Sequence, residues 1–173
     1  MRSDSLIILI LLLSLVYSCH SGKNTPVEVR KPGKNEMVEI NRYFVQKDKE
    51  VIESYAERKG LKMTESPTGL WYLINKQGTG NQLKDNDRVV MNYQCDLLDG
   101  TKCYSSNDSG PKEVVIGKSK IEQGLSEGLK LLRPGAEAIF IIPPHLGFGL
   151  LGDGAKIPPR AITIYYVTIA GKK

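Results

Sequence analysis

The spacing of apolar residues divides the chain into segments of different character. Residues 6–16 are apolar except for Ser14, and these eleven residues are too few for a helix across a bilayer core of about 30 Å. From Asn35 to Gly60 the apolar residues recur at helical spacing. They are Met37, Ile40, Phe44, Val51, Ile52 and Tyr55. The pattern predicts one amphipathic helix that ends near Gly60.

The pattern changes after this helix. Ser66-Pro67-Thr68-Gly69 interrupts it, and short β-type runs follow, bounded by turn residues. The predicted strands are 71–74, 89–97, 114–116, 138–142 and 162–169, with a short helix over 121–132 that ends before Pro134-Gly135. The expected fold class is α+β, with an antiparallel twisted sheet, or half-barrel, wrapped on one short helix and preceded by the amphipathic helix.

The apolar face of the amphipathic helix has three possible partners. It can pack on the main domain, pair with a second copy as a dimer through residues 35–60, or contact another protein. Packing on its own domain is favoured.

The N-terminal apolar run is typical of the central part of a signal peptide. It ends in Val16-Tyr17-Ser18-Cys19, which resembles the lipobox that is cut before a lipidated cysteine. The predicted organisation is a lipoprotein signal peptide (1–18), a flexible tether (19–34), the amphipathic helix with a linker (35–66) and the main domain (67–173). We expect a protein of the cell envelope, held on the membrane by lipidated Cys19, in the outer membrane and facing the periplasm.

Cysteine count and charge add little to this picture. An oxidising compartment raises the question of a bridge between Cys95 and Cys103. If Asp99-Gly100 forms a two-residue hairpin turn, these thiols lie on opposite faces of the sheet, and no bridge is expected. The net charge of +5 over 173 residues comes from mixed Lys, Arg, Asp and Glu, so no nucleic-acid partner is implied.

Residues for the common kinds of catalysis are missing. The two histidines, His20 and His145, have no cysteine or carboxylate neighbours at metal-ligand spacing, so neither a metal site nor a cofactor is expected. No nucleophile elbow, phosphate-binding glycine loop or paired-carboxylate motif is present. Any catalysis must therefore proceed without a nucleophile or a general base.

From Thr68 to Ala170 the order of residues resembles that of the FKBP-type peptidyl-prolyl isomerases. The matching positions are Thr68-Gly69-Leu70, Tyr72, Gly78, Gly80, Tyr93, Asp99-Gly100, Ser105-Ser106, Gly117, Ile121, Gly124, Glu127-Gly128-Leu129, Pro134-Gly135, Phe148-Gly149, Ile157-Pro158-Pro159 and Tyr165. The N-terminal segments further resemble the gliding-motility-associated isomerase-like lipoproteins of Bacteroidetes.

This resemblance implies a site that isomerises X-Pro bonds of exported polypeptides. The implied apolar floor and walls for the proline ring are Tyr93, Ile121, Leu125, Ile157 and Tyr165. The backbone N–H of Glu122 is implied to hold a substrate carbonyl. Without the resemblance, the same side chains read simply as core.

Four residues of the implied site differ from the family's usual residues. Leu125 stands where the family usually has Trp, Cys103-Tyr104 where it has Phe-Asp, and Phe148 where it has a tyrosine. Because of these changes we expect weak or moderate isomerase activity and poor binding of the family's macrolide inhibitors.

Two other functions stay open beside the enzyme. One is a non-catalytic module that binds or assembles partners through the same pocket, for example in gliding machinery. The other, which has less support, is a purely structural lipoprotein spacer.

Overall fold

The computed structural model describes residues 31–172 of the chain. The predicted signal peptide, Cys19 and most of the predicted tether lie outside these residues. From Lys34 onward the described residues form one compact unit that includes the amphipathic helix. The division at residue 66 stays a prediction. Within the described residues, no helix combines the length and the apolar character that crossing a membrane requires.

Helix α2 spans Lys34–Lys59, as the apolar spacing predicts. Glu36 lies in its first turn, and Arg58 and Lys59 lie in its last, where each charge complements the helix dipole. The helix ends at Gly60, whose φ of +64° is a left-handed conformation that glycine adopts without steric cost.

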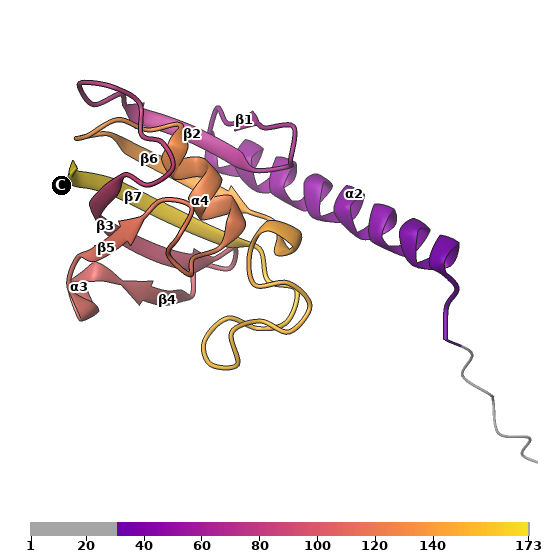
Figure 1. The fold of residues 1–173 in the computed structure, drawn as a ribbon. Coiled ribbons are helices and arrows are strands. Elements are labelled where there is room, and N and C mark those ends of the chain that lie inside the picture. The colour runs from indigo at the N-terminus through magenta and orange to yellow at the C-terminus, as the bar shows by residue number, and fades with distance from the viewer. Residues whose placement is uncertain (1–30, 173) are drawn as a thin grey trace, which may run out of the picture. The chain divides into compact units, whose positions relative to one another are not determined.

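The rest of the unit is an antiparallel sheet with short helices (Figure 1). Its strands are β1 (Thr64–Glu65), β2 (Trp71–Lys76), β3 (Arg88–Leu97), β4 (Lys102–Ser105), β5 (Lys112–Val115), β6 (Glu137–Ile142) and β7 (Thr163–Lys172). The strand order is β1-β2-β6-β7-β3-β4, and β5 also pairs with β3. The helices are α3 (Ser106–Ser109), α4 (Gln123–Lys130) and the 3-10 turn η1 (Pro144–Leu146). The predicted α+β class is confirmed.

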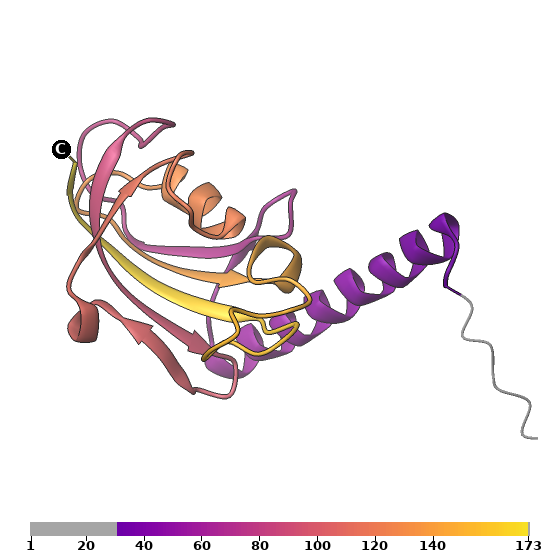
Figure 2. The same ribbon diagram turned by 60° about the horizontal axis from the view of Figure 1, so that its bottom comes forward.

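One core lies between the concave face of this curved sheet and α4 (Figure 2). On α4, Leu125 and Leu129 are fully buried. Gly128 allows α4 to approach β6 closely, because a Cβ at this position would lie 2.7 Å from the Phe140 ring. Alternate residues of β3, such as Val89 and Met91, complete the core from the sheet.

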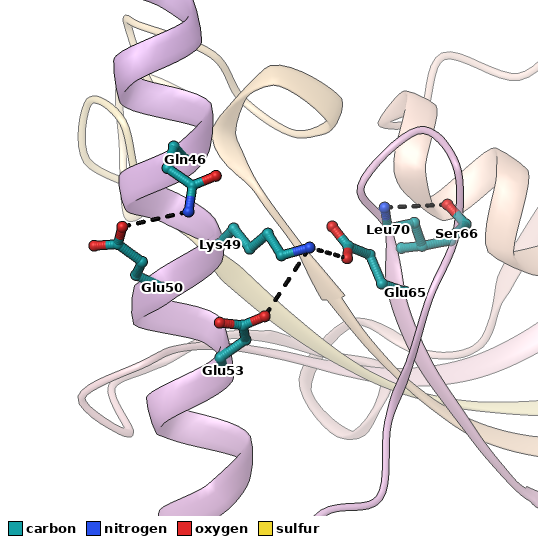
Figure 3. A network of polar contacts seen from close by, with 7 residues as sticks. All are labelled: Gln46, Lys49, Glu50, Glu53, Glu65, Ser66 and Leu70. Atoms are coloured by element: carbon teal, nitrogen blue, oxygen red, sulfur yellow. Dashed lines mark hydrogen bonds and ion pairs between the residues drawn. The ribbon is translucent and has the colours of Figure 1, made fainter.

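A second, smaller core lies on the opposite face of the sheet, where the last turns of α2 pack. Ile52 and Tyr55 contact a cluster that includes Trp71, Ile141 and Ile164. Lys49 of α2 adds ion pairs to Glu53 at 4.0 Å and to Glu65 of β1 at 2.5 Å (Figure 3). The C-terminal half of α2 therefore packs on its own domain. The N-terminal half leaves Met37, Val38, Ile40, Tyr43 and Val45 exposed.

The β3–β4 hairpin differs from the prediction. Its connection is a four-residue loop, because β3 ends at Leu97 and β4 begins at Lys102. A register shift also lies in this hairpin, so Cys95 pairs with Tyr104 but Asp96 pairs with Lys102. This bulge leaves Cys103 without a partner across the ladder and adds its side chain to the core that contains Cys95. The prediction of opposite faces is therefore wrong, and both cysteines are free thiols in one core.

Candidate active site

The nine side chains that the sequence proposes for the site come together on the concave face of the sheet. Eight belong to one apolar cluster, and the ninth, Glu122, reaches it through a hydrogen bond from Tyr165. The buried members are Cys103, Leu125, Ile157 and Tyr165, and the half-buried members are Tyr93, Tyr104, Ile121 and Phe148. They come from β3, β4, β7, α4 and the loops beside α4 and η1. The roles assigned to them stay predictions.

Two tyrosines on neighbouring strands form one wall of the cluster. Tyr93 of β3 and Tyr165 of β7 stack with ring centroids 6.3 Å apart and an interplanar angle of 28°. The ammonium group of Lys112 lies 5.8 Å from the centroid of the Tyr93 ring, within cation–π range. Offset stacking of this kind holds both rings in a fixed orientation.

The opposite side of the site is the start of α4. Glu122 is the N-cap of this helix, with φ −58° and ψ 144°, and its side chain makes no capping bond. Within the described part of the chain, the Glu122 N–H donates to no other group. It is therefore available to bind a carbonyl oxygen, as the resemblance implies.

The Glu122 carboxylate points into the cluster. Its Oε1 accepts a hydrogen bond of 2.8 Å from the Tyr165 hydroxyl. Its Oε2 is buried and has no hydrogen-bond partner among the described residues. Burial, together with the negative charge of Glu122, holds the pKa of Tyr165 far above its usual value, so its hydroxyl is protonated and donates.

A second polar contact fixes the loop between η1 and β7. The Tyr104 hydroxyl donates to Asp153 Oδ2, and this hydrogen bond holds the pKa of the Asp153 carboxyl below its usual range. Asp153 Oδ1 accepts from the backbone N–H of Ala155 at 2.9 Å and of Ile157 at 2.8 Å. The loop therefore presents Ile157 to the cluster in one position.

Asp153 and Lys156 are residues of this region that the sequence analysis missed. Lys156 lies with its ammonium group 5.3 Å from the centroid of the Tyr104 ring, and its carbonyl accepts a weak hydrogen bond of 3.6 Å from Cys103 Sγ. The sequence Gly152-Asp153-Gly154 could have indicated the role of Asp153, because an aspartate in such a turn commonly accepts hydrogen bonds from backbone N–H groups.

The floor of the site is closed in this structure. Cys95 and Leu125 are 0% exposed, Cys103 and Ile157 are 2% exposed, and Tyr165 is 4% exposed. A proline ring can therefore contact these side chains only after one of the half-buried side chains above them moves.

The site contains no candidate for metal chemistry. Between residues 31 and 172, no three His, Cys, Asp or Glu side chains are grouped so that they could hold a metal ion. His145 instead makes a contact of 3.0 Å between its Nε2 and the Thr68 carbonyl oxygen. What the arrangement offers chemically is an apolar cluster, a free N–H and the tyrosine hydroxyl.

Comparison with known proteins gives matches to FKBP-type isomerases. Residues 80–170 match the family model described as FKBP-type peptidyl-prolyl cis-trans isomerase. A probable FKBP-type isomerase, FkpA of Neisseria meningitidis, is 37% identical over 124 residues, which is 72% of this chain and 44% of that protein. FkpA of Escherichia coli K12 is 35% identical over 127 residues, 73% of this chain and 46% of that protein. The chain thus spans less than half the length of these relatives.

Solved structures agree with the sequence matches. The crystal structure of FkpA from Escherichia coli superposes with a TM-score of 0.62 at 26% identity, covering 100% of this chain and 83% of that one. The crystal structure of AtFKBP13 gives a TM-score of 0.60 at 26% identity, covering 65% of this chain and 99% of that one. The fold of the described unit is therefore the one that these proteins share.

Proposed function

Because this chain belongs to the FKBP-type peptidyl-prolyl cis-trans isomerase family, we propose that it isomerises X-Pro bonds of exported polypeptides. The observation that carries the proposal is the convergence of the apolar cluster, the Tyr93–Tyr165 pair and the free Glu122 N–H in one place.

The chemistry needs neither a nucleophile nor a metal. Rotation about an X-Pro bond has a barrier of about 18–20 kcal/mol because it breaks amide resonance, and uncatalysed exchange takes roughly tens to hundreds of seconds. The twisted amide is less dipolar than the planar amide. An apolar site therefore disfavours the planar ground state relative to the transition state, which is the differential binding that lowers a barrier.

Each part of the site has a distinct task in this reaction. Leu125 and Ile157 receive the proline ring, and Tyr93 and Tyr165 form the aromatic wall. The Glu122 N–H binds a substrate carbonyl and fixes one side of the amide while the other side turns.

The test is catalysed cis-to-trans relaxation of a series of X-Pro peptides by the purified full chain. Tyr93→Ala should abolish the rate above background. Tyr166→Ala is the matched control, since Tyr166 follows Tyr165 on β7 and strand alternation places its side chain on the opposite face of the sheet. A folded chain without any rate above background would contradict the proposal.

The closed floor favours one second candidate, a binding module without catalysis. In this function the same domain holds partners, for example during assembly of membrane-associated machinery such as that of gliding motility. Partner capture that survives the loss of all isomerase activity would support this candidate over the enzyme.

We further propose that lipidation of Cys19 anchors the chain on the envelope, in the outer membrane facing the periplasm. Val16-Tyr17-Ser18-Cys19 supports this proposal through its likeness to a lipobox, and diacylglycerol with a further acyl chain gives stable anchoring. Incorporation of labelled fatty acid that Cys19→Ala abolishes is the expected result. Equal labelling of the variant would contradict it.

A dimer through α2 is also proposed. Of the exposed apolar residues in its N-terminal half, Val45 lines a groove of about 290 Å³ together with Phe44, Pro144 and Leu150. A second copy of the helix would cover these side chains. Sedimentation should show a dimer that Ile40→Glu converts to a monomer, whereas a wild-type monomer at all concentrations would contradict the proposal.

A further inference from the structure

Glu122 lies in an unfavourable environment for a carboxylate. One of its oxygens has only the Tyr165 hydroxyl as a partner, and the other is covered by protein without any hydrogen bond among the described residues. A buried and unpaired oxygen of a charged group costs free energy that water would recover. Exposure of the Glu122 side chain to solvent would therefore recover this free energy.

The buried carboxylate of Glu122 lies at the proposed site. Its carboxylate contacts Tyr165, a wall of the cluster into which a proline ring would enter. The floor beneath is closed, so substrate entry requires a side chain to move.

Five side chains of the proposed site are half-buried, and each of them loses contacts by moving. Tyr93 is stacked on Tyr165, and Tyr104 is hydrogen-bonded to Asp153. Ile121 and Phe148 are apolar and pack against the cluster, so their exposure to water is unfavourable. Glu122 alone gains hydration at an unpaired oxygen when it leaves.

We propose that Glu122 determines which substrates this site accepts, because its side chain occupies the proline pocket and must be displaced from Tyr165 before a proline ring reaches Leu125. This inference rests on the proposed isomerase function. On displacement the Tyr165 hydroxyl exchanges its acceptor from Glu122 Oε1 to a substrate carbonyl. No covalent bond changes, and the Glu122 N–H is still available at the start of α4.

A consequence concerns the class of substrate. The apparent affinity of a site that is mostly closed is reduced by its open fraction. Short X-Pro peptides, which contact little beyond the pocket, are therefore poor substrates. Unfolded polypeptides that make additional contacts with the domain offset the displacement and are better substrates.

The experiment measures KM and kcat of the full chain for an X-Pro tetrapeptide. In Glu122→Ala the KM should fall by about 3- to 10-fold with kcat retained, as expected if the wild-type site is open for roughly 10–30% of the time. Glu122→Gln keeps the length and an acceptor for Tyr165, so its KM should stay above that of Glu122→Ala. Glu137→Ala, an exposed glutamate of β6, is the control for a change of charge alone.

A second comparison tests the tyrosine. Tyr165→Phe added to Glu122→Ala removes the hydroxyl that the open site would offer to the substrate, so kcat should fall below that of Glu122→Ala. An equal kcat in these two variants would show that the hydroxyl serves only to hold Glu122, and would overturn that part of the inference.

The outcomes separate this inference from the proposed function. An active wild type whose Glu122→Ala variant is folded but has an unchanged or higher KM overturns the inference alone. If the wild type is inactive, calorimetric titration with the same peptide measures binding instead. Tighter binding by Glu122→Ala than by the wild type then supports the inference for a domain that binds without catalysis. Absence of both activity and binding in the two proteins contradicts the proposed function and the inference together.

Discussion

Tyr104 donates its hydroxyl hydrogen to Asp153, and this bond joins β4 to the loop that carries Ile157. The family usually has Phe-Asp where this chain has Cys103-Tyr104, so the family's carboxylate is missing from β4 at this wall. The structure shows a carboxylate beside the wall after all, supplied by the loop between η1 and β7. Its oxygens are occupied by Tyr104 and by two backbone N–H groups, so it stabilises the loop.

Tyr104→Phe should loosen this loop. The change removes the hydroxyl that Asp153 accepts and leaves the apolar ring in place, so we expect the unfolding midpoint to fall by a few degrees. Hydrogen exchange at Ala155 and Ile157 should become faster, because their N–H groups donate to the same carboxylate. Unchanged exchange at both residues would show that the tyrosine does not stabilise the loop.

The effect of Tyr104→Phe should also depend on pH. The pKa of Asp153 is lowered in the folded protein, first by the hydrogen bond from Tyr104. A lowered carboxyl pKa contributes stability above the unfolded value of about 3.9, and this contribution is lost as pH falls through the folded value. The difference in midpoint between wild type and variant should therefore be present at pH 7 and should shrink below about pH 4. A constant difference across this range would exclude Asp153 as the partner.

The two core cysteines should resist alkylation until the protein unfolds. Burial raises the pKa of Cys95 to about 12 and also raises the pKa of Cys103, so neither forms its reactive thiolate at pH 8. Iodoacetamide should label both only in denaturant, with peptides resolved by mass spectrometry so that Cys19 is counted separately. Rapid labelling of Cys103 in the native protein would show that its wall of the site opens.

The sequence predicts most of the framework because each element has a local signal. The apolar period and Gly60 define α2, and alternation defines β3, so both are found where expected. The β3–β4 hairpin was mispredicted because a bulge and a four-residue loop, neither visible as a hydrophobic pattern, replace the expected two-residue turn.

The same limit applies to the site. The nine proposed side chains converge because their positions follow from the order of strands and helices, which a family resemblance preserves. The inward position of the Glu122 carboxylate and the pairing of Tyr104 with Asp153 do not follow from spacing. They depend on side chains that are distant in sequence and meet only in the folded chain.

Gly128→Ala should destabilise the protein even though alanine is the better helix former. The new methyl group would lie 2.7 Å from the Phe140 ring, and such overpacking costs about 1–3 kcal/mol, while the gain in helix propensity returns about 1 kcal/mol. Ser126→Ala in the same helix is the control, and its propensity change alone should raise stability slightly. Denaturant unfolding measures both variants. Greater stability of Gly128→Ala would mean that α4 does not pack this closely on β6.

Arg160 should be important for the docking of α2. It has a positive φ of 57°, uncommon for a residue other than glycine, and its guanidinium makes two contacts of 3.1 Å with Asp48 of α2. It also lies 3.9 Å from the centroid of the Phe44 ring. Arg160→Ala removes the ion pair with Asp48 and the contact with the Phe44 ring. We expect the free energy of unfolding to fall by about 1 kcal/mol and hydrogen exchange in α2 to become faster.

The loss of stability in Arg160→Ala should depend on pH and on a second substitution, because both affect the charge of Asp48. The pKa of Asp48 is raised, mainly by burial and in spite of the opposing Arg160 charge, so its ionised form is unfavourable in the fold once Arg160 is gone. A raised carboxyl pKa means that stability is present at low pH and is lost as pH rises through the folded value. The deficit of Arg160→Ala should therefore be larger at pH 7 than at acidic pH, and Asp48→Asn should restore part of it at pH 7. If the two substitutions are strictly additive and the deficit does not change with pH, the ion pair does not hold α2 on the domain.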